Sequence, residues 1–554
     1  MKRIGIVIFT LPLILSGFLS PRCRAATYQS NGTVESIQFF HNQVRNGDTI
    51  TLPAGTFTWT TKLTITKAIT LQGAGVGSTI IKDAVQSGQL LEVTLAAGNL
   101  TRITGIEFQD GGRTSTQIGI FRVFGSNTNG STFRWDHCKW TALNGIPTFD
   151  TVIGVIDHNT FFLGTVGPAI EISGTQWNGR DFGDGSWAAA TAYGSPQFLF
   201  IEDNVFTHNQ TGLHGMTDAY AGARFVVRHN SIFNGTISNH GTESTGRWRG
   251  CRAVEVYNNR FTGTNLNRFV GGFRSGGVLF HDNNISGYWG DSAEFMLVNF
   301  RSFHDFQPWG GADGTSVWDA NNPAASFTGT AAANSGDRTV TVSGANWTSN
   351  QWAGYTIRRT TNVCNSSSLE FSWILGNTSN TITYYGGAIY PGEINLNFCT
   401  GDSLEIRKVN HALDQPGVAR GSLVTGGLNP TPPPGWNDQV IEPCYSWNNI
   451  NELGHHVNFV AGPGVRANEH YFNNTSMPGY APYVYPHPLV TAQPSPPPSP
   501  PPSPPPSPTC SNLQQRLNRL QQRRQRLQQR HRQNQQLNRK IRRLRQQLQA
   551  QHCV

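Results

Sequence analysis

The sequence lacks the short motifs that mark common metal and nucleotide sites. It contains no HExxH, CxxC or EF-hand pattern, so no motif supports a zinc or calcium site. The Gly-rich run within 62–81 lacks the GK[ST] ending of a phosphate loop, and no helical pattern follows it. The motifs therefore indicate no metal site and leave any cofactor unknown.

Apolar runs that would cross a bilayer comfortably are also missing. Residues 1–25 carry Lys2 and Arg3 directly after Met1, continue with an apolar core from Ile4 to Leu19, and reach Ala25 before an expected cut. That core is short for a membrane span, and the order of its parts is typical of a secretory signal peptide. We therefore expect a soluble exported protein that is secreted, extracellular or associated with a cell surface.

Acidic residues are absent from 511–554, a segment that holds eleven Arg and Lys540. Removing these 12 from the 42 basic residues leaves 30, against 33 Asp and Glu. The net charge of +9 is thus +12 from this segment and −3 from everything else. The excess of basic residues belongs to the tail, so the positive net charge does not indicate that the rest of the chain binds nucleic acid.

The same tail carries a heptad seam. Its members are Leu513, Leu520, Leu527, Asn534, Ile541 and Leu548. Near His531 the companion apolar position shifts from four residues after the seam to three, which fits either an interrupted coiled coil or two short helices folded back on each other. We expect this tail to bind an anionic polymer or a cell surface. Oligomerisation and a disordered tail without function are the alternatives, and we do not expect nucleic acid.

One phrase recurs five times between residues 155 and 285: apolar residues, a polar pair, an asparagine and a large hydrophobe. The shared asparagines are Asn159, Asn204, Asn230, Asn259 and Asn283. Their gaps are 45, 26, 29 and 24 residues, so the first is about two of the others. FRWDHCKW at 133–140 fits the same frame, with Cys138 in the place of the asparagine. Short repeats built on strand-like runs predict an all-β solenoid, a parallel β-helix.

Three features resemble the right-handed parallel β-helix superfamily typified by pectate lyases: NGDTITLPAGTFTW (46–59), the turn ITLQGAG (69–75) and the recurring asparagine coils. The resemblance covers about residues 34–300 and resumes near 440–475. It implies the fold and selects no activity, because this fold hosts lyases, hydrolases, esterases, epimerases and binding proteins.

WDHC at 135–138 resembles a motif of calcium-dependent pectate lyases. Those enzymes also use an Arg-x-Pro-x-x-Arg stretch, which this sequence lacks. Neither calcium nor a pectate-lyase site is therefore assigned to Asp136.

We interpret the repeated asparagines as turn residues. Asparagine tolerates the left-handed backbone conformation, and coils stacked about 4.8 Å apart would let the amides form a ladder. N-glycosylation at several N-x-S/T sequons is the alternative.

Two other segments depart from the coil pattern. Apolar residues at helical spacing in 34–44 predict a helix that caps the exposed edge of the first coil. Short alternating strands in 325–410 predict a small inserted β module. The module could bind carbohydrate, although a structural role is the simpler interpretation. Cys364 and Cys399 within it could pair.

The remaining cysteines divide by region. Cys510 and Cys553 bracket the tail, whereas Cys138, Cys251 and Cys444 lie in the repeats, where we expect buried free thiols. Before the tail, 494–508 reads PSPPPSPPPSPPPSP, a stiff spacer. The expected domain order is a signal peptide (1–25), the β-helix (26–324), the inserted β module (325–410), the remaining coils and C-terminal cover (411–490), the Pro/Ser-rich linker (491–509) and the basic helical tail (510–554).

A β-helix offers a long, shallow groove that suits an extended polymer. We expect five segments to lie side by side on one face, at 169–174, 216–220, 237–242, 268–273 and 296–301. The densest polar group is HGTESTGRWRGCR at 240–252, an unusually long connection between strands. The expected catalytic residues are Asp218, His240, Glu243 and Arg249. The expected substrate contacts are His214, Arg247, Arg252, Arg268, Arg274 and Trp289.

Two mechanisms fit these residues. In β-elimination, arginines neutralise a uronate carboxylate while His240 or an arginine removes the α-proton. In hydrolysis, Asp218 and Glu243 form the acid/base pair. Because arginine dominates, a lyase for an acidic glycan comes first and a glycoside hydrolase second. A non-enzymatic adhesin or structural glycan-binding protein is the third hypothesis, and ion pairs that only close a loop would explain the same residues.

Overall fold

The computed structural model describes most of the chain between residues 25 and 550. The described residues are 25–163, 169–177, 190–208, 215–241, 250–266, 270–288, 292–295, 325–368, 371–385, 396–407, 414–418, 441–461, 465–491, 515, 517–522 and 535–550. They divide into two compact units, one from Ala25 to Thr491 and one that contains the C-terminal tail.

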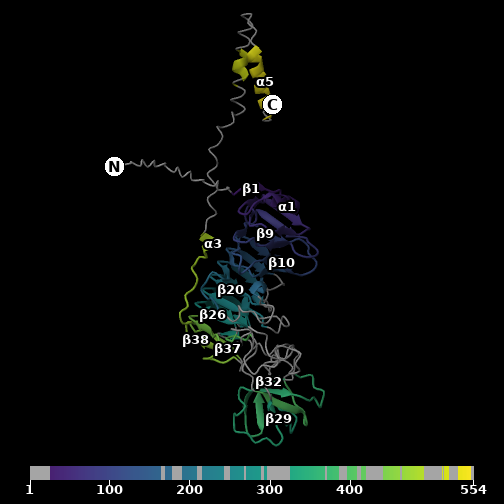
Figure 1. Ribbon diagram of the computed structural model, residues 1–554, viewed down its shortest axis with the longest axis vertical. Helices are drawn as coiled ribbons and strands as arrows, with labels where there is room; N and C mark the ends of the chain where they lie inside the picture. The colour runs from purple at the N-terminus through teal and green to yellow at the C-terminus, as the bar shows by residue number, and fades with distance from the viewer. Residues whose placement is uncertain are drawn as a thin grey trace, which may run out of the picture. The chain divides into compact units, whose positions relative to one another are not determined.

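Three parallel sheets form the larger unit, and successive strands enter them in rotation. Sheet 1 contains, in spatial order, β1 (Thr27–Gln29), β2 (Thr49–Thr51), β5 (Thr70–Gln72), β8 (Leu100–Thr104), β11 (Thr132–Asp136), β14 (Gly154–Asp157), β17 (Leu199–Glu202), β20 (Arg224–Arg228), β23 (Ala253–Tyr257), β26 (Gly277–His281), β35 (Cys444–Trp447) and β38 (Tyr471–Asn473). Each triplet of strands makes one coil, so the chain is a parallel β-helix, as the repeats predict (Figure 1).

The other two sheets follow the same order along the solenoid. Sheet 2 contains β3 (Gly55–Trp59), β6 (Thr79–Asp83), β9 (Glu107–Asp110), β12 (Lys139–Thr141), β15 (Thr160–Leu163), β18 (Val205–His208), β21 (Ser231–Phe233), β24 (Arg260–Leu266), β27 (Asn284–Tyr288) and β36 (Ile450–Asn451). Sheet 3 contains β4 (Leu63–Ile65), β7 (Leu91–Thr94), β10 (Gln117–Phe124), β13 (Gly145–Asp150), β16 (Ile170–Ser173), β19 (Gly215–Tyr220), β22 (Thr236–Ser238), β25 (Gly271–Phe273), β28 (Ser292–Phe295) and β37 (Asn458–Ala461).

The 45-residue gap between the first two repeats is a single coil. Gly154 of β14 pairs directly with Leu199 of β17, so the extra residues form an excursion after β16. A much longer excursion separates β28 from β35, and β26 pairs directly with β35 across it. The register of the coils is therefore kept through connections of very different length.

A buried asparagine ladder joins these coils at the turn between sheets 1 and 2. The backbone N–H of each ladder asparagine donates to the side-chain oxygen of the next, at 2.9–3.0 Å from Asn159 to Asn283 and at 3.1 Å from Asn283 to Asn449. Cys138 occupies the same position one coil earlier, and its N–H donates to Asn159 Oδ1 at 2.8 Å. The predicted structural role is therefore correct.

The left-handed residue of each turn is the residue before the ladder asparagine, which corrects the sequence interpretation. His158, Asp203, His229, Asn258 and Asp282 have φ between 54° and 56°. The asparagine itself is needed for its side chain, whose amide satisfies buried backbone groups on neighbouring coils.

Apolar side chains fill the interior between the three sheets. Trp135 is fully buried there, with its ring edge-to-face against Phe121 at 4.8 Å and Phe161 at 5.4 Å. Cys138, Cys251 and Cys444 are free and buried, as expected. At the N-terminal end, α1 (Val34–Gln43) packs Val34 and Ile37 into this core, and Thr33 Oγ1 accepts the N–H of Ser36 at the start of the helix.

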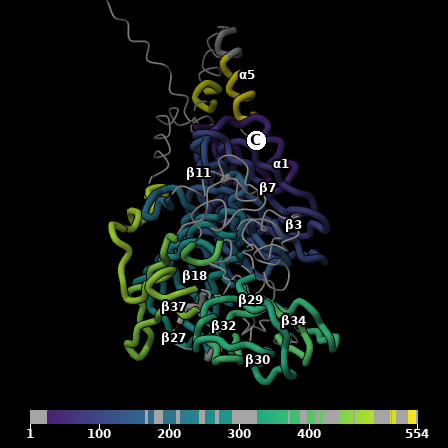
Figure 2. The backbone as a smooth tube through the Cα atoms, turned by 60° about the horizontal axis from the view of Figure 1, so that its bottom comes forward, coloured from purple at the N-terminus to yellow at the C-terminus, as the bar shows by residue number. Residues whose placement is uncertain are grey.

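The outer face of sheet 1 is covered by residues 480–491, here called the strap, which ends in α3 (Pro488–Thr491). Figure 2 shows this yellow-green segment running beside the coils. Arg228 donates to the carbonyl oxygens of Tyr483 at 2.7 Å and Val484 at 2.9 Å. Further along, Arg134 donates to the carbonyl oxygen of Leu489 at 2.9 Å. Buried charged side chains of sheet 1 therefore hold the strap.

Acidic residues of sheet 1 hold the strap as well. Tyr480 Oη donates to Glu255 Oε2 at 2.6 Å, and the N–H of His487 donates to Glu202 Oε1 at 2.8 Å. Burial raises the pKa of both carboxyl groups. These charges bind a segment of the chain itself, so this outer face of the solenoid is already occupied.

A six-stranded antiparallel sheet lies within the 325–410 segment. Its order is β29 (Ala325–Thr330), β34 (Ser403–Arg407), β31 (Thr356–Arg359), β32 (Phe371–Asn377), β33 (Thr381–Tyr384) and β30 (Thr339–Thr341). It has its own apolar cluster, which includes Ile357, Ile382 and Ile406. Cys364 and Cys399 form a disulfide, as the sequence suggested.

Helices are few in the described part of the chain, and none there is long and apolar enough for a membrane span. A single 3-10 turn, η1 (Thr175–Trp177), follows β16. In the separate tail unit, α5 (Gln535–Ala550) is helical.

Candidate functional site on sheet 3

The outer face of sheet 3 carries a continuous row of polar residues. The strands pair in register, so that Glu92, Arg122, Thr148, Glu171 and Asp218 follow one another across five coils. Because strand side chains alternate, their neighbours point inward. Val93, Val123, Phe149, Ile172 and Ala219 are all fully buried. The alternation therefore keeps the polar row on the surface.

Four of the five segments expected on one face lie where the sequence predicted. They contain or overlap β16, β19, β22 and β25, which are consecutive neighbours in sheet 3. The fifth segment, 296–301, lies outside the described residues, and β28 at Ser292–Phe295 occupies the next place in the sheet.

The side chains of Asp218 and His240 contact each other on this face. His240 Nε2 lies 2.6 Å from Asp218 Oδ2, and the two side chains are 27% and 18% exposed. His240 follows β22, and its N–H donates to the carbonyl oxygen of Ala219 at 2.7 Å. The backbone bond places the imidazole beside the carboxylate, and both groups remain accessible from solvent.

Glu171 lies directly opposite Asp218 on the neighbouring strand. Tyr220 Oη donates to Glu171 Oε1 at 3.0 Å. Partial burial raises the pKa of the Glu171 carboxyl group. The Tyr220 hydrogen bond opposes that shift, and the negative charge of Asp218 adds to it. Burial and the neighbouring Glu171 also raise the pKa of the Tyr220 hydroxyl. Glu171 and Asp218 therefore lie side by side, with Tyr220 as the partner of Glu171 and His240 as the partner of Asp218.

Arg122 lies two strands from Glu171 in the same row. Its guanidinium stacks over the ring of Phe124 with 4.4 Å from Cζ to the ring centroid. Its positive charge lowers the pKa of Glu171, although less than burial raises it. An exposed cation on an aromatic ring can contact both the hydroxyl and the carboxylate groups of a sugar.

The two described arginines from the expected site are buried. Arg252 is fully buried and forms an ion pair with Glu442 at 2.6 Å. Arg274 donates through Nε to the carbonyl oxygen of Asn239 at 2.9 Å, and its side chain is also buried. A polymer on the outer face would not contact the Arg252 side chain, so that residue has no part in our proposal.

The other expected site residues lie outside the described residues. They are the catalytic candidates Glu243 and Arg249, and the substrate-binding candidates His214, Arg247, Arg268 and Trp289. Their roles remain predictions.

Sequence reasoning did not name Glu171 or Tyr220 as site residues. Both occur in segments assigned to the groove, 169–174 and 216–220. The sequence signal for Glu171 is the alternation of polar and apolar residues along a strand, because Glu171 stands between the apolar Ile170 and Ile172. The contact of Tyr220 with Glu171, and of Glu171 with Asp218, can be predicted only from the strand register, which is kept across a coil of 45 residues.

Asp136 of the WDHC motif is unavailable to a metal. Its carboxylate is fully buried and is paired with Arg102 at 2.6 Å and with His137 at 2.7 Å. These contacts lower its pKa against the opposing effect of burial. The residue therefore has a structural role.

Within the described part of the chain, one group has metal-ligand spacing: Cys364, Cys399 and Asp402. The two cysteines form the disulfide. Both Asp402 oxygens accept backbone N–H groups at 2.6 Å, from Val363 and Cys399. The cluster therefore fixes a loop of the antiparallel module and is not a metal site.

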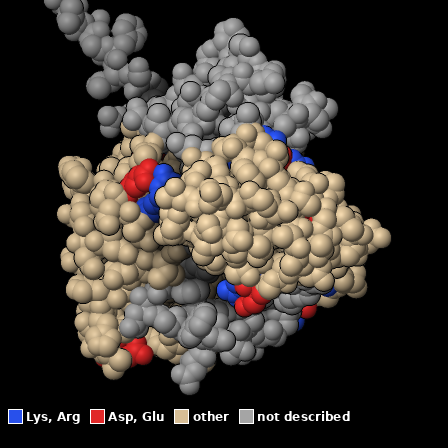
Figure 3. Space-filling model, turned by 90° about the horizontal axis from the view of Figure 1, so that it is seen from below, with Lys and Arg blue, Asp and Glu red and all other residues tan. Residues whose placement is uncertain are grey.

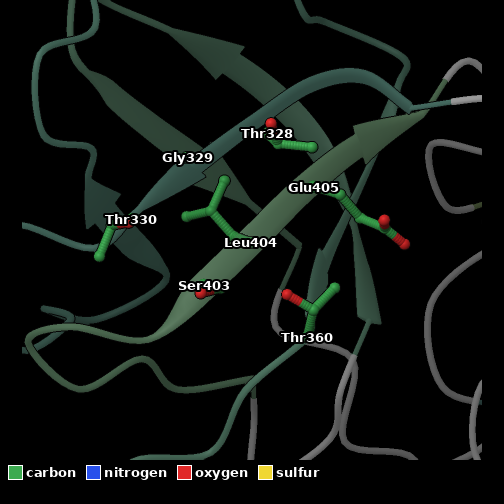
Figure 4. A pocket seen from close by; sticks show the side chains of 7 residues that line it. All are labelled: Thr328, Gly329, Thr330, Thr360, Ser403, Leu404 and Glu405. Atoms are coloured by element: carbon green, nitrogen blue, oxygen red, sulfur yellow. The ribbon is translucent and has the colours of Figure 1, made fainter.

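A shallow hollow of about 290 Å³ lies on the same module (Figure 4). Its lining residues are Thr328, Gly329, Thr330, Thr360, Ser403, Leu404 and Glu405. Glu405 pairs with Arg407 at 2.9 Å, so the charged group at the hollow is neutralised. The face in Figure 3 likewise shows blue and red groups adjacent to each other. The hollow has polar walls and no pair of catalytic groups.

No family model and no curated protein matches this chain. Among solved structures, two of the PL6 family alginate lyase AlyGC, one of them a mutant, are 16% identical to it, with TM-scores of 0.27 and 0.25. The match covers 48% of this chain and only 38–39% of those chains.

Two phage proteins are also similar. ORF18 of Geobacillus virus E2 is 14% identical with a TM-score of 0.32, covering 65% of this chain and 76% of that one. The tailspike of E. coli bacteriophage HK620, solved with a pentasaccharide, is 11% identical with a TM-score of 0.23, covering 69% and 93%. The three parallel sheets of this chain have the β-helix architecture that its repeats and its resemblance to the superfamily predict.

Proposed function

We propose that this protein cleaves an extended glycan that lies along the outer face of sheet 3. The observation that carries the proposal is the direct pairing of Glu171 with Asp218 on neighbouring strands. Both side chains are partly exposed and point away from the core. The row continues over several coils on either side, which suits a polymer better than a small ligand.

Paired carboxyl groups are the ordinary means of glycoside hydrolysis. Neighbouring strands lie about 4.8 Å apart, close to the separation of about 5–5.5 Å that retaining glycosidases use. Glu171, whose pKa is raised by burial, is suited to protonate the leaving oxygen. Asp218 would act as the nucleophile, and His240 holds its carboxylate in position. Glu171, deprotonated in the first step, would then take a proton from the water that displaces Asp218 from the sugar.

Hydrolysis thereby moves ahead of β-elimination in our proposal. The lyase hypothesis rested on arginines, of which Arg252 is buried and paired. Among the described residues of the site, the carboxyl groups of Glu171 and Asp218 lie side by side, whereas the nearest arginine of the row, Arg122, lies two strands from Glu171. A uronate carboxylate beside Glu171 and Asp218 would be repelled unless a cation lay between them.

One observation favours β-elimination as the second candidate. A histidine paired with a carboxylate is a suitable general base, and His240 pairs with Asp218. Arg122 supplies an exposed positive charge in the same row. In that reaction His240 would remove the α-proton of a uronate, a C=C bond would form as the glycosidic C–O bond broke, and the departing oxygen would take up a proton to leave as a hydroxyl group.

Export, which residues 1–25 predict, would bring the enzyme into contact with extracellular polysaccharides. We retain the proposed domain division, with the solenoid as the catalytic body and the Pro/Ser-rich linker and basic tail as a separate attachment module.

The test is incubation of the purified protein with a panel of neutral and acidic polysaccharides. New reducing ends without ultraviolet absorbance from unsaturated sugars support hydrolysis, whereas both signals together support β-elimination. Binding without either signal on any polymer would refute cleavage and leave the adhesin hypothesis.

A further inference from the structure

The basic tail forms a small helical unit with its own apolar cluster. Leu517, Ile541, Leu544 and Leu548 are buried together, and Leu520 packs against them. Residues 517–522 are helical, as is α5. Apolar residues from both segments therefore face each other within one chain, as the folded-back arrangement predicts.

This packing uses the apolar stripe that a coiled-coil oligomer would need. Ile541 and Leu548 belong to the heptad seam, and both are almost fully buried in the cluster. The described surface of the unit is polar, so oligomerisation through the seam is the weaker alternative.

The basic side chains that the structure describes lie on the outside of this unit. Arg519, Lys540, Arg542, Arg543 and Arg545 are all exposed. Segment 511–554 contains no Asp or Glu that could neutralise them. A helix with this charge repels itself, and a bound polyanion would relieve that repulsion.

We propose that the exposed basic face of α5 (Gln535–Ala550) in the tail is a second glycan-binding site and that its ligand is a polyanionic polysaccharide. This goes beyond the proposed function, because the tail would bind an acidic polymer, or an acidic stretch of one, whether or not sheet 3 cleaves it. Residues three or four apart on a helix place their Cβ atoms about 5–6 Å apart. One sugar extends a polymer by a similar distance, so each uronate or sulfate of a chain can meet one arginine of a row.

Guanidinium groups suit this ligand because their planar donors pair bidentately with carboxylate and sulfate groups. The Pro/Ser-rich stretch 494–508 would act as a stiff spacer between this site and the solenoid. Two sites on one chain raise the effective concentration of polymer at the second site, provided that the linker spans the gap.

The experiment uses the full chain on immobilised polyuronate, eluted with rising salt. The test variant combines Arg542→Gln, Arg543→Gln and Arg545→Gln. The matched control combines Gln546→Ala, Gln547→Ala and Gln549→Ala on the same helix. Circular dichroism verifies that both variants keep the helix. We expect the arginine variant to lose roughly tenfold to hundredfold in affinity, with elution at lower salt, and the control to match the parent chain.

Equal retention of the arginine variant and the parent would overturn the proposal. So would elution of the parent from double-stranded DNA at higher salt than from polyuronate, because nucleic acid would then be the preferred polyanion. A companion variant, Asp218→Asn, separates this proposal from the catalytic one. Tail-dependent retention of that variant, or of a parent chain that cleaves nothing, supports the tail site even where cleavage fails.

Discussion

His240 Nε2 lies 2.6 Å from Asp218 Oδ2, across two neighbouring strands of sheet 3. The contact joins a residue inside β19 to one that follows β22. Glu171 lies on the other side of Asp218, so three ionisable groups from three coils meet on one open face. The β-helix creates this cluster because it holds strands in register whatever the length of the loops between them.

Tyr220→Phe should shift the pH dependence of cleavage upward. The Tyr220 hydroxyl lowers the pKa of Glu171 by donating to its ionised form. Without this bond the pKa of Glu171 rises, so the protonated acid persists to higher pH. We expect the alkaline limb of kcat/KM to move up by roughly one pH unit. Tyr445→Phe, on sheet 1, is the control that should leave the profile unchanged. A downward shift would exclude Glu171 as the acid.

Asn230→Ala should destabilise the solenoid strongly. Asn230 Oδ1 accepts the N–H of Asn204 at 2.9 Å, and its amide donates to the carbonyl oxygens of Ile201 and Arg228 at 2.8 Å. Each buried group left without a partner costs about 1–3 kcal/mol, so we expect a loss of about 3 kcal/mol or more in chemical unfolding.

Asn258→Gly provides the comparison for the ladder variant. Asn258 is exposed with φ 54°, a conformation that glycine adopts freely. The loss of unfolding free energy in Asn258→Gly should stay within about 0.5 kcal/mol. If the two variants unfold alike, the ladder does not stabilise the coils.

Arg228→Met should loosen the strap. Arg228 is fully buried between Glu202, at 2.6 Å, and two strap carbonyl groups. Removing one member of a buried pair leaves the other charge uncompensated, at a cost of about 3–5 kcal/mol. Limited proteolysis should cut the strap sooner than in the parent chain.

Arg466→Met tests whether this effect needs burial. Arg466 pairs with Glu469 at 2.6 Å on the surface, and exposed pairs contribute about 0–1 kcal/mol. In Arg466→Met the protease should cut the strap at the same rate as in the parent chain. Equal protection of the strap in Arg228→Met would show that other contacts hold it.

Acid should weaken the strap through His487. Burial, with the charges of Arg228 and Arg134, lowers the pKa of His487 from 6.5 to about 4. The unfolded chain therefore takes up a proton first as pH falls below 6.5. The stability that the neutral imidazole contributes is complete above pH 6.5 and is lost toward pH 4, by roughly 3 kcal/mol.

His487→Asn isolates this contribution. An asparagine oxygen can replace Nδ1, which accepts the N–H of Leu489 at 3.2 Å. Glu202 acts in the opposite sense, because its raised pKa adds stability as pH falls, and it is unchanged in the variant. Unfolding at pH 7 and pH 4.5 should show a smaller difference in His487→Asn than in the parent chain. An equal difference would assign the pH dependence to other groups.

The repeats predicted the fold because the asparagine position is local. Each of Asn204, Asn230 and Asn259 sits in the same short phrase, so their stacking can be predicted without knowledge of the loops between them. Their backbone conformation was misjudged because asparagine favours positive φ in isolation, whereas here the preceding residue adopts it.

The contacts of the candidate site are harder to predict, for a different physical reason. Asp218 and His240 can be named as candidates from the sequence because they lie near a polar connection, and their roles stay predictions. Glu171 and Tyr220 are 49 residues apart and meet only because β16 pairs with β19. Arg252 was chosen from the same polar connection, but its side chain packs inward against Glu442. Sequence proximity reveals neither register nor the direction in which a long side chain turns.

The most direct test of the catalytic proposal is cleavage of a polysaccharide by Glu171→Gln and Asp218→Asn, compared with Glu92→Gln. Glu92 lies in the same row and pairs with Lys62 at 3.1 Å. Glu92→Gln therefore makes the same type of substitution at a position away from the paired carboxyl groups. Loss of a catalytic acid or nucleophile should lower kcat by about 10²–10⁴-fold, while polymer binding persists and Glu92→Gln stays close to the parent chain. Parental turnover in both Glu171→Gln and Asp218→Asn would contradict the account.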